Sequence, residues 1–395
     1  MSDNTTTTSG PKPDIIRIGF VGLSSTGWAA MALKHSLLDP LVQEHFKLVA
    51  ISTTNEASAL ASAATYTEAF GTPIKAYWGD ASKIANDPEV DLVAISVKAP
   101  HHKGIALKAI EAGKDFFLEW QAGRDEKETR ELADKAKAKG VKSLIGLQAR
   151  HGGVIQKARK IIEEGKIGKV LSTTVNFLMP REINSMAPHV LSRLEYALKP
   201  ENQITLINSP GGHFFDVFIQ VLGPLSRVSA SGTSIYPTVT LLDDATSQPT
   251  TATHPAFFPD HITINGILKS SGAWVTVIIR QGHKSTPGRT QLNWEIDGED
   301  GVVKIEDNRS LGMNMGAHDP EHLYLNGEEV VWDEEKEGHA KYESPVPFLR
   351  DNWLAFYKGR ENGANYMDIE EAAKLRDFLA AITKSIEEGG RWIDL

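Results

Sequence analysis

The sequence predicts an α/β protein with two domains: a doubly wound parallel sheet, followed by an α+β domain with a large open mixed sheet. Three observations predict this class. The 395 residues are 41% hydrophobic and 24% charged, which is ordinary for a globular chain long enough for about two or three domains. Short apolar runs alternate with helical patterns in the N-terminal part. Longer strands of alternating polarity dominate the rest.

The first domain is expected over residues 15–147, after a polar tail at 1–14 whose Thr, Ser, Gly and Pro content is typical of disorder. Five apolar runs predict strands: Ile15–Val21, Leu48–Ser52, Leu92–Val97, Phe116–Leu118 and Ser143–Leu147. Helical patterns lie between them at Glu56–Ala69, His102–Ala112 and Asp125–Ala138. Strands that are apolar on both faces need cover on both faces, so this order predicts a parallel sheet between helices.

The second domain is expected over residues 148–395 and opens with a helix that ends at Gly165. Strands of alternating polarity follow: Val170–Phe177, Val228–Gly232, Thr263–Lys269, Trp274–Arg280, Gln291–Asp297 and Gly301–Glu306. Glycine-containing links predict hairpins among them, and therefore an open sheet with one free face. We expect Thr238–Pro259 to be a long loop. The last helix is expected over 368–387, with Asp368 as its cap.

Composition and charge exclude several classes of function. The chain has no cysteine, which excludes disulfides, thiolate catalysis and Cys-ligated zinc. Its 42 basic and 51 acidic side chains give a net charge of −9, and no nucleic-acid-binding motif is present, so we expect no direct contact with nucleic acid. No run of about 18 apolar residues and no secretory signal is seen. We expect no membrane contact and a cytoplasmic location, or a nuclear one for a regulator.

The first strand runs into a glycine turn that is typical of phosphate binding. Its pattern is Gly22-x-Ser24-x-x-Gly27, a GxGxxG motif with Ser in the middle. Gly22 would allow the tight turn, and Gly27 would let the following helix approach the sheet while backbone N–H groups hold a pyrophosphate. The turn lies on the first strand of a βαβ pattern, which is the context that this motif requires. The sequence therefore predicts a Rossmann domain with a dinucleotide site here.

The end of the second strand bears on which dinucleotide is bound. An acidic residue usually holds the ribose hydroxyls of NAD at this position, but the chain has Ser52-Thr53-Thr54-Asn55 there. Thr53 and Thr54 could hydrogen-bond a 2′-phosphate, although no arginine accompanies them. The expected cofactor is NAD or NADP, with a slight preference for NADP.

Three further stretches resemble the Gfo/Idh/MocA oxidoreductase family: Val90–Lys98 with His101-His102, Ala109–Glu119, and Gln148-Ala149-Arg150 followed by Ile161–Val170. The resemblance runs from Ile15 to the C-terminal helix. Within the family, the chain most resembles the Gal80-like fungal branch of galactose regulators. That likeness rests on Gly19–Leu23 with Gly27-Trp28, Glu119-Trp120, Ser143–Arg150 and Pro259–His261.

The resemblance implies that a nicotinamide cofactor lies between the domains and that two copies form a homodimer through the free face of the second sheet. Together with the glycine turn, it suggests a set of cofactor-binding residues: Gly22, Ser24, Ser25, Thr26, Gly27, Trp28, Thr53, Thr54, Val97, Lys98, His102, Glu119, Trp120, Gln148 and Arg150.

The residues that usually carry the chemistry of this family are altered. Family oxidoreductases have a lysine after the matching glutamate, and an Asp four residues before a second-domain His. This chain has Trp120 and Ser209 at those positions and keeps the histidine as His213. Hydride transfer from a C–OH group needs a nearby proton acceptor. We therefore name Lys98, His213 and Tyr196 as candidate catalytic residues, and we assign no residue to a metal.

Three functions remain open on this evidence. The first is an NAD(P)-dependent oxidoreductase with a rearranged acid/base site that acts on a sugar, ketone or imine. The second is a catalytically silent NAD(P)-binding transcriptional regulator of the Gal80-like kind, acting through a protein partner. The third is a cofactor-binding scaffold. An apolar wall at Trp120 suits hydride transfer to a hydrophobic acceptor as well as it suits a silent site, and we lean to the enzyme.

Overall fold

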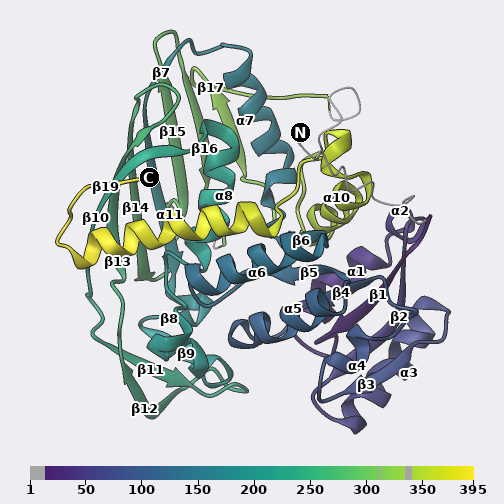
Figure 1. Cartoon of the computed structure of the whole chain (residues 1–395). Helices are drawn as coiled ribbons and strands as arrows, with labels where there is room; N and C mark the ends of the chain where they lie inside the picture. The colour runs from purple at the N-terminus through teal and green to yellow at the C-terminus, as the bar shows by residue number, and fades with distance from the viewer. Residues whose placement is uncertain (1–13, 310, 313, 334–339) are drawn as a thin grey trace, which may run out of the picture.

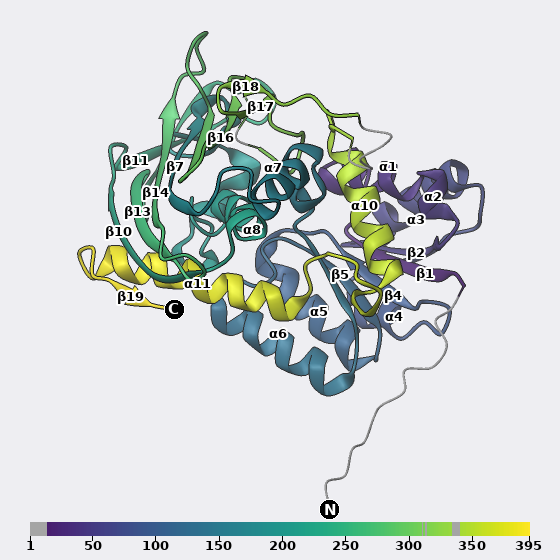
Figure 2. The same cartoon turned by 90° about the horizontal axis from the view of Figure 1, so that it is seen from above.

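The structure is a computed structural model that describes residues 14–309, 311–312, 314–333 and 340–395. The predicted tail lies outside these residues except for Asp14. Figure 1 shows the first domain, in purple and blue, beside a second domain built on a tall sheet, in teal and green. A long C-terminal helix runs along both domains, as the view from above also shows (Figure 2). No helix in the described ranges is both long and apolar enough to cross a membrane.

The first domain is a six-stranded parallel sheet with the order β3-β2-β1-β4-β5-β6, which is the strand order of dinucleotide-binding folds. Its strands are β1 Ile16–Val21, β2 Phe46–Thr53, β3 Lys75–Trp78, β4 Leu92–Ile95, β5 Asp115–Glu119 and β6 Ser143–Gly146. The predicted doubly wound sheet is confirmed. Strand β3 was not predicted, because its four residues are too few to show a period.

Helices cover both faces of this sheet. They are η1 Ala29–Leu33, α1 Lys34–Leu37, α2 Pro40–Gln43, α3 Glu56–Phe70, α4 Ser82–Ala85, η2 Ala99–His101, α5 His102–Glu111 and α6 Glu126–Lys139. The Asn55 side chain accepts the N–H of Ser58 at the start of α3, at 2.9 Å. The Asp125 carboxylate accepts the N–H of Glu128 at the start of α6, at 2.8 Å. Each cap satisfies a backbone donor that the helix itself leaves unpaired.

The second domain is a nine-stranded mixed sheet with the order β18-β17-β16-β15-β7-β14-β13-β10-β19, so the predicted mixed sheet is confirmed. Its strands are β7 Val170–Pro180, β10 Leu225–Thr233, β13 His261–Leu268, β14 Trp274–His283, β15 Leu292–Gly298, β16 Val302–Asp307, β17 His322–Leu325, β18 Glu328–Glu329 and β19 Ile393–Asp394. The domain also contains helices and short helical turns: η3 Ala149–His151, α7 Gly153–Glu163, η4 Arg181–Ile183, η5 Ser192–Leu198, η6 Pro200–Asn202 and α8 Pro210–Leu222. Aromatic side chains seat α8 on the sheet, where the rings of Phe218 and Trp294 stack at 5.6 Å.

The expected long loop at Thr238–Pro259 is wrong. This segment forms β11 Thr238–Leu242 and β12 Pro249–Pro255, which join β8 Ser185–Met186 and β9 His189–Leu191 in a small four-stranded sheet. Figure 1 shows this sheet below the main one. Val239, Leu241 and Leu242 are buried. Prolines lie within β12 itself, and this strand is mostly exposed, so the Pro- and Thr-rich composition hid a short hairpin whose first strand is partly buried.

The C-terminal segment returns to the first domain through α10 Pro345–Lys358 and then η7 Arg360–Asn362. Trp353 on α10 is buried, with its ring centroid 4.8 Å from that of Phe117 on β5. Its indole N–H donates to the Ser36 hydroxyl at 3.2 Å. Residues from 345 onward therefore complete the hydrophobic core of the first sheet.

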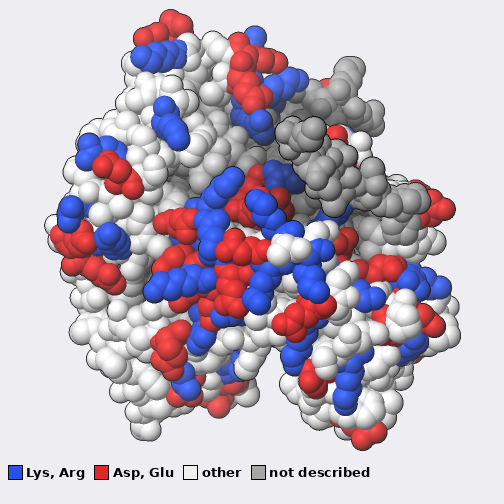
Figure 3. Space-filling view, in the orientation of Figure 1, with Lys and Arg blue, Asp and Glu red and all other residues white. Residues whose placement is uncertain are grey.

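The last helix, α11 Ile369–Glu387, lies along α6. Its predicted cap is present, because the Asp368 carboxylate accepts the N–H of Glu371 at 2.8 Å. Charges of both signs mingle on the face formed by these two helices (Figure 3). Ion pairs that join them include Arg130 with Asp377, and Lys137 with Glu370 at 3.6 Å. The helix thus ties the second domain to the first.

Candidate cofactor and substrate site

The predicted glycine turn has the geometry of a phosphate-binding turn. Gly22 has a φ of +96°, and a Cβ there would lie 2.1 Å from the Ser96 carbonyl oxygen. Only glycine therefore lets the turn pack against the loop after β4. Gly27 has a φ of +90°, and a Cβ there would have no atom within 4 Å. The turn is open on that side, between the β2 and β4 neighbours of β1, where such sheets bind ligands.

Internal hydrogen bonds shape the rest of the turn. The Ser24 hydroxyl donates to the Thr26 carbonyl at 3.0 Å, and the Tyr66 hydroxyl donates to the Ser24 carbonyl at 2.6 Å. Ser25 and Thr26 are exposed at the tip. The hydroxyl of Ser24 thus stabilises the turn itself.

The end of β2 carries the two predicted threonines. The Thr53 hydroxyl lies 2.6 Å from the Ser58 hydroxyl at the start of α3. Thr54 is exposed, and the Asn55 amide N–H donates weakly to its hydroxyl at 3.5 Å. These hydroxyl and amide groups line the position where a ribose or its 2′-phosphate is recognised in this fold.

A cavity of about 300 Å³ lies between the domains, beyond the carboxyl ends of β4 and β5. It is lined by Trp28, Ser96, Val97, Glu119, Trp120, Gln148, His213, Asn314 and Gly316. Five of these residues belong to the cofactor-binding set named from the sequence, and His213 is a candidate catalytic residue, so the fold gathers six named residues around one space. We call this space the cofactor cavity.

Glu119 is the acidic group of the cofactor cavity. Its Oε1 accepts the indole N–H of Trp28 at 2.9 Å. Burial raises the pKa of Glu119 to about 7, against hydrogen bonds from Trp28 and from the Trp120 backbone that lower it. A carboxyl with this pKa exchanges its proton near neutral pH.

Trp120 forms an apolar wall of the cofactor cavity. Its indole N–H donates to the Asn208 carbonyl at 2.8 Å, and a Cβ on Gly212 would lie 2.4 Å from the indole nitrogen. Behind the ring, the guanidinium carbon of Arg376 lies 6.0 Å from the ring centroid. One guanidinium N–H of Arg376 donates to the Arg124 carbonyl at 2.7 Å. The tryptophan is therefore held from both sides.

Two buried polar atoms in the cofactor cavity have no hydrogen-bond partner among the described residues. They are Nδ1 of His213 and Oε1 of Gln148. The Gln148 amide N–H donates to the Gly316 carbonyl at 2.9 Å, which orients that side chain. Burial lowers the pKa of His213 to about 4. A nicotinamide ring suits this cavity, because its carboxamide can donate to the unpaired oxygen of Gln148 while Trp120 supplies an apolar face.

A second cavity of about 470 Å³ adjoins the first. It is lined by Phe177, Met179, Glu182, Ile183, Ser185, Met186, Ser209, Pro210, His213, Phe214, Leu311, Asn314 and Met315. His213 and Asn314 line both spaces. We call this second space the substrate cavity. The imidazole of His213 stands at the junction of the two.

The structure does not bring the other candidate catalytic residues to this junction. Lys98 is exposed, and its ammonium lies 4.8 Å from the centroid of the Tyr196 ring. Neither side chain lines the cofactor or the substrate cavity. Burial raises the pKa of Tyr196, so its phenol stays protonated at neutral pH. The two residues contact each other at the border between the first domain and η5.

Two predicted cofactor contacts lie behind the cavity wall. His102 is buried, with Nδ1 2.6 Å from the Gln121 carbonyl and Nε2 2.9 Å from the Val97 carbonyl. Arg150 is also buried, and it pairs with Asp216 on α8 and donates to the Asn365 side chain at 2.8 Å. His102 joins the loops after β4 and β5, while Arg150 anchors α8. Both side chains position the walls without lining the cavity.

Sequence reasoning missed Ser96, Asn314 and Gly316 in the cofactor cavity, and most of the substrate cavity. Ser96 follows directly on β4, so its place at the carboxyl edge of the sheet was a signal that could have found it. Asn314 and Gly316 come from a turn-rich segment with no periodic pattern. Only the fold brings that segment to His213.

The fold and these cavities define a two-domain dinucleotide-binding protein with an oxidoreductase-like site. Residues 16–147 match the model of the oxidoreductase family with an NAD-binding Rossmann fold, Gfo/Idh/MocA. Residues 153–307 match the model of the Gal80p C-terminal domain. The chain thus combines a Gfo/Idh/MocA Rossmann domain with a Gal80p-like C-terminal domain, and the predicted resemblance is confirmed.

Individual relatives divide between enzymes and regulators. The chain is 29% identical to the dehydrogenase aclE of Aspergillus oryzae over 81% of this chain and 84% of that protein. It is 25% identical to the galactose/lactose metabolism regulatory protein GAL80 of Kluyveromyces lactis over 75% of this chain and 65% of that protein. The crystal structure of a super-repressor mutant of Gal80p from Saccharomyces cerevisiae matches with a TM-score of 0.82 and 18% identity, covering 96% of this chain and 98% of that one. This last likeness shows the shared fold.

Proposed function

We propose that this protein is an NAD(P)-dependent oxidoreductase in which His213 handles the substrate proton. One observation carries the proposal: the cofactor cavity and the substrate cavity are adjacent, and His213 lines both. Hydride transfer requires two bound molecules with their reacting atoms side by side and a proton-handling group within reach. The match to an oxidoreductase family and the 29% identity to a dehydrogenase support the same class.

The chain's residues have distinct roles in this proposal. The glycine turn at Gly22 and Gly27 holds phosphates, and Trp120 and Gln148 orient the ring. When bound, the nicotinamide supplies or accepts a hydride. His213 is neutral at pH 7 because burial lowers its pKa to about 4. A ring nitrogen can therefore accept a hydrogen bond, and then the proton, from a substrate hydroxyl. Glu119, whose pKa is about 7, can hold a proton in the same cavity near neutral pH.

The test is absorbance at the reduced-nicotinamide band, with all four nicotinamide forms and a panel of alcohols, ketones, imines and sugars. We expect turnover that falls by about 10²–10⁴-fold in His213→Ala while the cofactor dissociation constant stays unchanged. Lys98→Met is the comparison variant. Since Lys98 lies outside both cavities, it should keep most of the activity. A loss confined to Lys98→Met would assign the proton to Lys98 instead, and full activity in His213→Ala would refute the proposed role of His213.

A second candidate function is a regulator that binds NAD(P) and a protein partner without turnover. The observations that favour it are Trp120 and Ser209 at the positions of the usual lysine and aspartate, and the match of residues 153–307 to the Gal80p C-terminal domain. Cofactor binding with no turnover of any substrate in the panel would select this function. A pull-down of partner proteins with and without NAD(P) would then follow.

Three finer features complete the proposal. We propose that the cofactor is NADP in preference to NAD, because hydroxyl and amide groups, and no carboxylate, stand at the end of β2. We propose that two copies pair through the outward face of the nine-stranded sheet, which light scattering of the purified protein will test. A cytoplasmic location is proposed for the enzyme, and a nuclear one as well for the regulator.

A further inference from the structure

We infer that the substrate cavity selects a compound with an apolar ring, aromatic or alicyclic, that bears one reactive carbonyl, imine or hydroxyl group. Polyhydroxylated sugars are disfavoured by the same argument. The inference rests on the proposed function, because it takes the space beside the cofactor cavity as the substrate site. It adds to that function the chemical class of the substrate.

Eight of the 13 residues that line the substrate cavity are apolar, and five of these eight are phenylalanine or methionine. Phe177 on β7 and Phe214 on α8 are each 1% exposed in the structure, and their ring centroids lie 5.8 Å apart. Met179, Met186 and Met315 also line the space. Aromatic rings offer large flat contact areas, and methionines adapt their shape and make favourable contacts with rings. Ile183, Met186 and Leu311 keep accessible apolar surface in the structure, and a bound ring would gain free energy by taking that surface out of water.

Five of the 13 residues that line the cavity are polar or charged, and the other eight are apolar; the five are Glu182, Ser185, Ser209, His213 and Asn314. Glu182 is exposed, and its carboxylate accepts the backbone N–H of Ser285 at 3.1 Å. Ser185 and Ser209 offer hydroxyls, and His213 stands at the inner end. A sugar carries a hydroxyl on nearly every carbon, and each would need a partner when buried. The Phe and Met walls provide none, so a sugar would lose more hydrogen bonds to water than it regained.

The position of His213 fixes the orientation of the substrate. It is the only ionisable side chain that lines both cavities in the described part of the chain. The reactive group of the substrate must therefore face His213, and the ring must extend toward Phe177 and Met179. A cavity of about 470 Å³ lies within the range of small-molecule sites. It has room for one or two fused rings.

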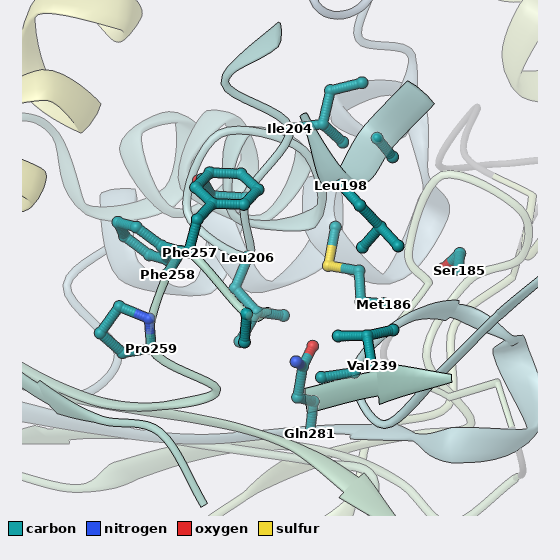
Figure 4. Close-up of a pocket in the computed structure, with 14 residues that line it drawn as sticks. Ser185, Met186, Leu198, Ile204, Leu206, Val239, Phe257, Phe258, Pro259 and Gln281 are labelled. Atoms are coloured by element: carbon teal, nitrogen blue, oxygen red, sulfur yellow. The ribbon is translucent and has the colours of Figure 1, made fainter. Parts of the chain in front are cut away.

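Met186 gives this cavity a movable wall. Ser185 and Met186 also line a separate small cavity of about 40 Å³ under the four-stranded sheet. Figure 4 shows the Met186 side chain between Leu198, Leu206 and Val239 in that small cavity. The space beyond Met186 lets its flexible thioether shift when a bulkier ring enters, without displacing the main chain. The substrate cavity can therefore accept rings of more than one size.

The experiment compares matched probes with full-length protein loaded with reduced cofactor. Cyclohexanone and 2-tetralone represent the apolar ring, D-fructose represents the sugar, and cyclohexanecarboxamide serves as an unreactive ring. Turnover is followed by absorbance, and binding by the change in fluorescence of the bound reduced nicotinamide. We expect the two ring ketones to have kcat/KM values at least tenfold above that of D-fructose. The carboxamide should bind and compete with the ketones.

The variant is Met186→Asn, which places a polar amide in the movable wall. It should weaken binding of 2-tetralone and of the carboxamide by about tenfold, the size expected for loss of an apolar contact in a pocket, with unchanged cofactor affinity. Leu60→Asn makes a similar change at a side chain that is 54% exposed on α3 and should alter neither. A normal far-ultraviolet circular dichroism spectrum of Met186→Asn shows that the variant is folded.

The possible results separate the inference from the proposed function. Turnover that favours D-fructose would overturn the inference and leave the oxidoreductase function standing. Carboxamide binding that Met186→Asn weakens would support the apolar cavity even without turnover of any probe, and the absence of turnover across the full panel of alcohols, ketones, imines and sugars would refute the oxidoreductase function. No binding of either ring or sugar probes, with the cofactor bound, would overturn the inference.

Discussion

Glu119 lines the cofactor cavity, and the ionisation of its carboxyl also affects the stability of the fold. Burial raises its pKa to about 7 from a model-compound value of 4.5, and the hydrogen bond from Trp28 offsets only part of that cost. In the unfolded chain the same carboxyl ionises near 4.5. Between these two pH values the folded state holds a proton that the unfolded state has lost. Stability therefore falls as pH rises from about 4.5 to about 7, and this contribution is level above pH 7.

Replacing Glu119 by Gln should remove that dependence. The Gln side chain carries no charge, so the variant should become more stable relative to the native protein as pH rises. We expect a difference near zero at pH 5 that grows to about 1–3 kcal/mol at pH 8. Urea unfolding at several pH values measures it. Glu68→Gln, at an exposed position of α3, should show no such trend, and a constant difference for Glu119→Gln would refute a shifted carboxyl.

Gly212 tests whether the position of Trp120 matters for cofactor binding. Gly212→Ala would put a methyl group 2.4 Å from the indole nitrogen, and the ring must move. Overpacking of this kind costs about 1–3 kcal/mol, so we expect the cofactor to bind about tenfold more weakly and tryptophan fluorescence to change. Gly104→Ala on α5 is the control, because a Cβ there meets no atom within 4 Å. Unchanged cofactor affinity in Gly212→Ala would mean that Trp120 does not touch the ring.

The sequence could identify the cavity-lining residues that belong to motifs. Trp28, Glu119 and Gln148 follow strands or turns whose place in the sheet is set by topology. Lys98 satisfies the same rule, yet its side chain lies over Tyr196. A strand end tells which edge of the sheet a residue occupies, but the direction of a long side chain depends on neighbours from distant segments. Asn314 illustrates the same limit, since no local pattern marks it.

At the scale of elements, α10 is the helix whose removal from its place should cost most. Trp353→Ala would open a cavity between Phe117 and Phe46, whose ring centroids lie 4.8 and 5.5 Å from the indole. Large-to-small changes at such sites cost about 3–5 kcal/mol, and Ser36 would lose its hydrogen-bond donor. We expect a clear fall in thermal midpoint by calorimetry.

The control for that prediction is Trp274→Ala at the start of β14 in the large sheet. Trp274 is 47% exposed, so its loss should cost much less than that of Trp353. Equal effects of the two substitutions would contradict the placement of α10 in the core of the first domain.

The elements that sequence reasoning found are those with a strong local period. The apolar runs of the first sheet, the hairpins of the second and the capped helix α11 all carry such a signal. Strand β3 and the hairpin of β11 and β12 do not, because β3 has only four residues and β12 is rich in threonine and proline. Helix α10 begins with Pro345-Val346-Pro347, which resembles a loop, although proline is accepted in a first helical turn.

At the scale of the whole molecule, the cofactor cavity joins the two domains. Trp28 and Glu119 come from the first domain, while His213 and Gly316 come from the second. Helix α11 and its ion pairs with α6 hold the domains on either side of this space. A ligand in the cavity contacts both domains at once, so its binding free energy should stabilise the entire fold.

Linkage makes that expectation quantitative. A ligand that binds only the folded state at 100 times its dissociation constant raises the free energy of unfolding by about 2.7 kcal/mol. We expect both NADH and NADPH to raise the thermal midpoint by a few degrees, and NADPH to give the larger shift at equal concentration.

The matched variants are Gly27→Asp and Gly27→Asn, whose side chains have the same shape and differ in charge. Asn and Asp tolerate positive φ better than other side chains, and the space beside Gly27 is open. The aspartate should repel the phosphates and abolish the shift, whereas the asparagine should keep most of it. Equal shifts in the two variants would place the phosphates away from this turn, and a larger shift with NADH would reverse the proposed preference for NADP.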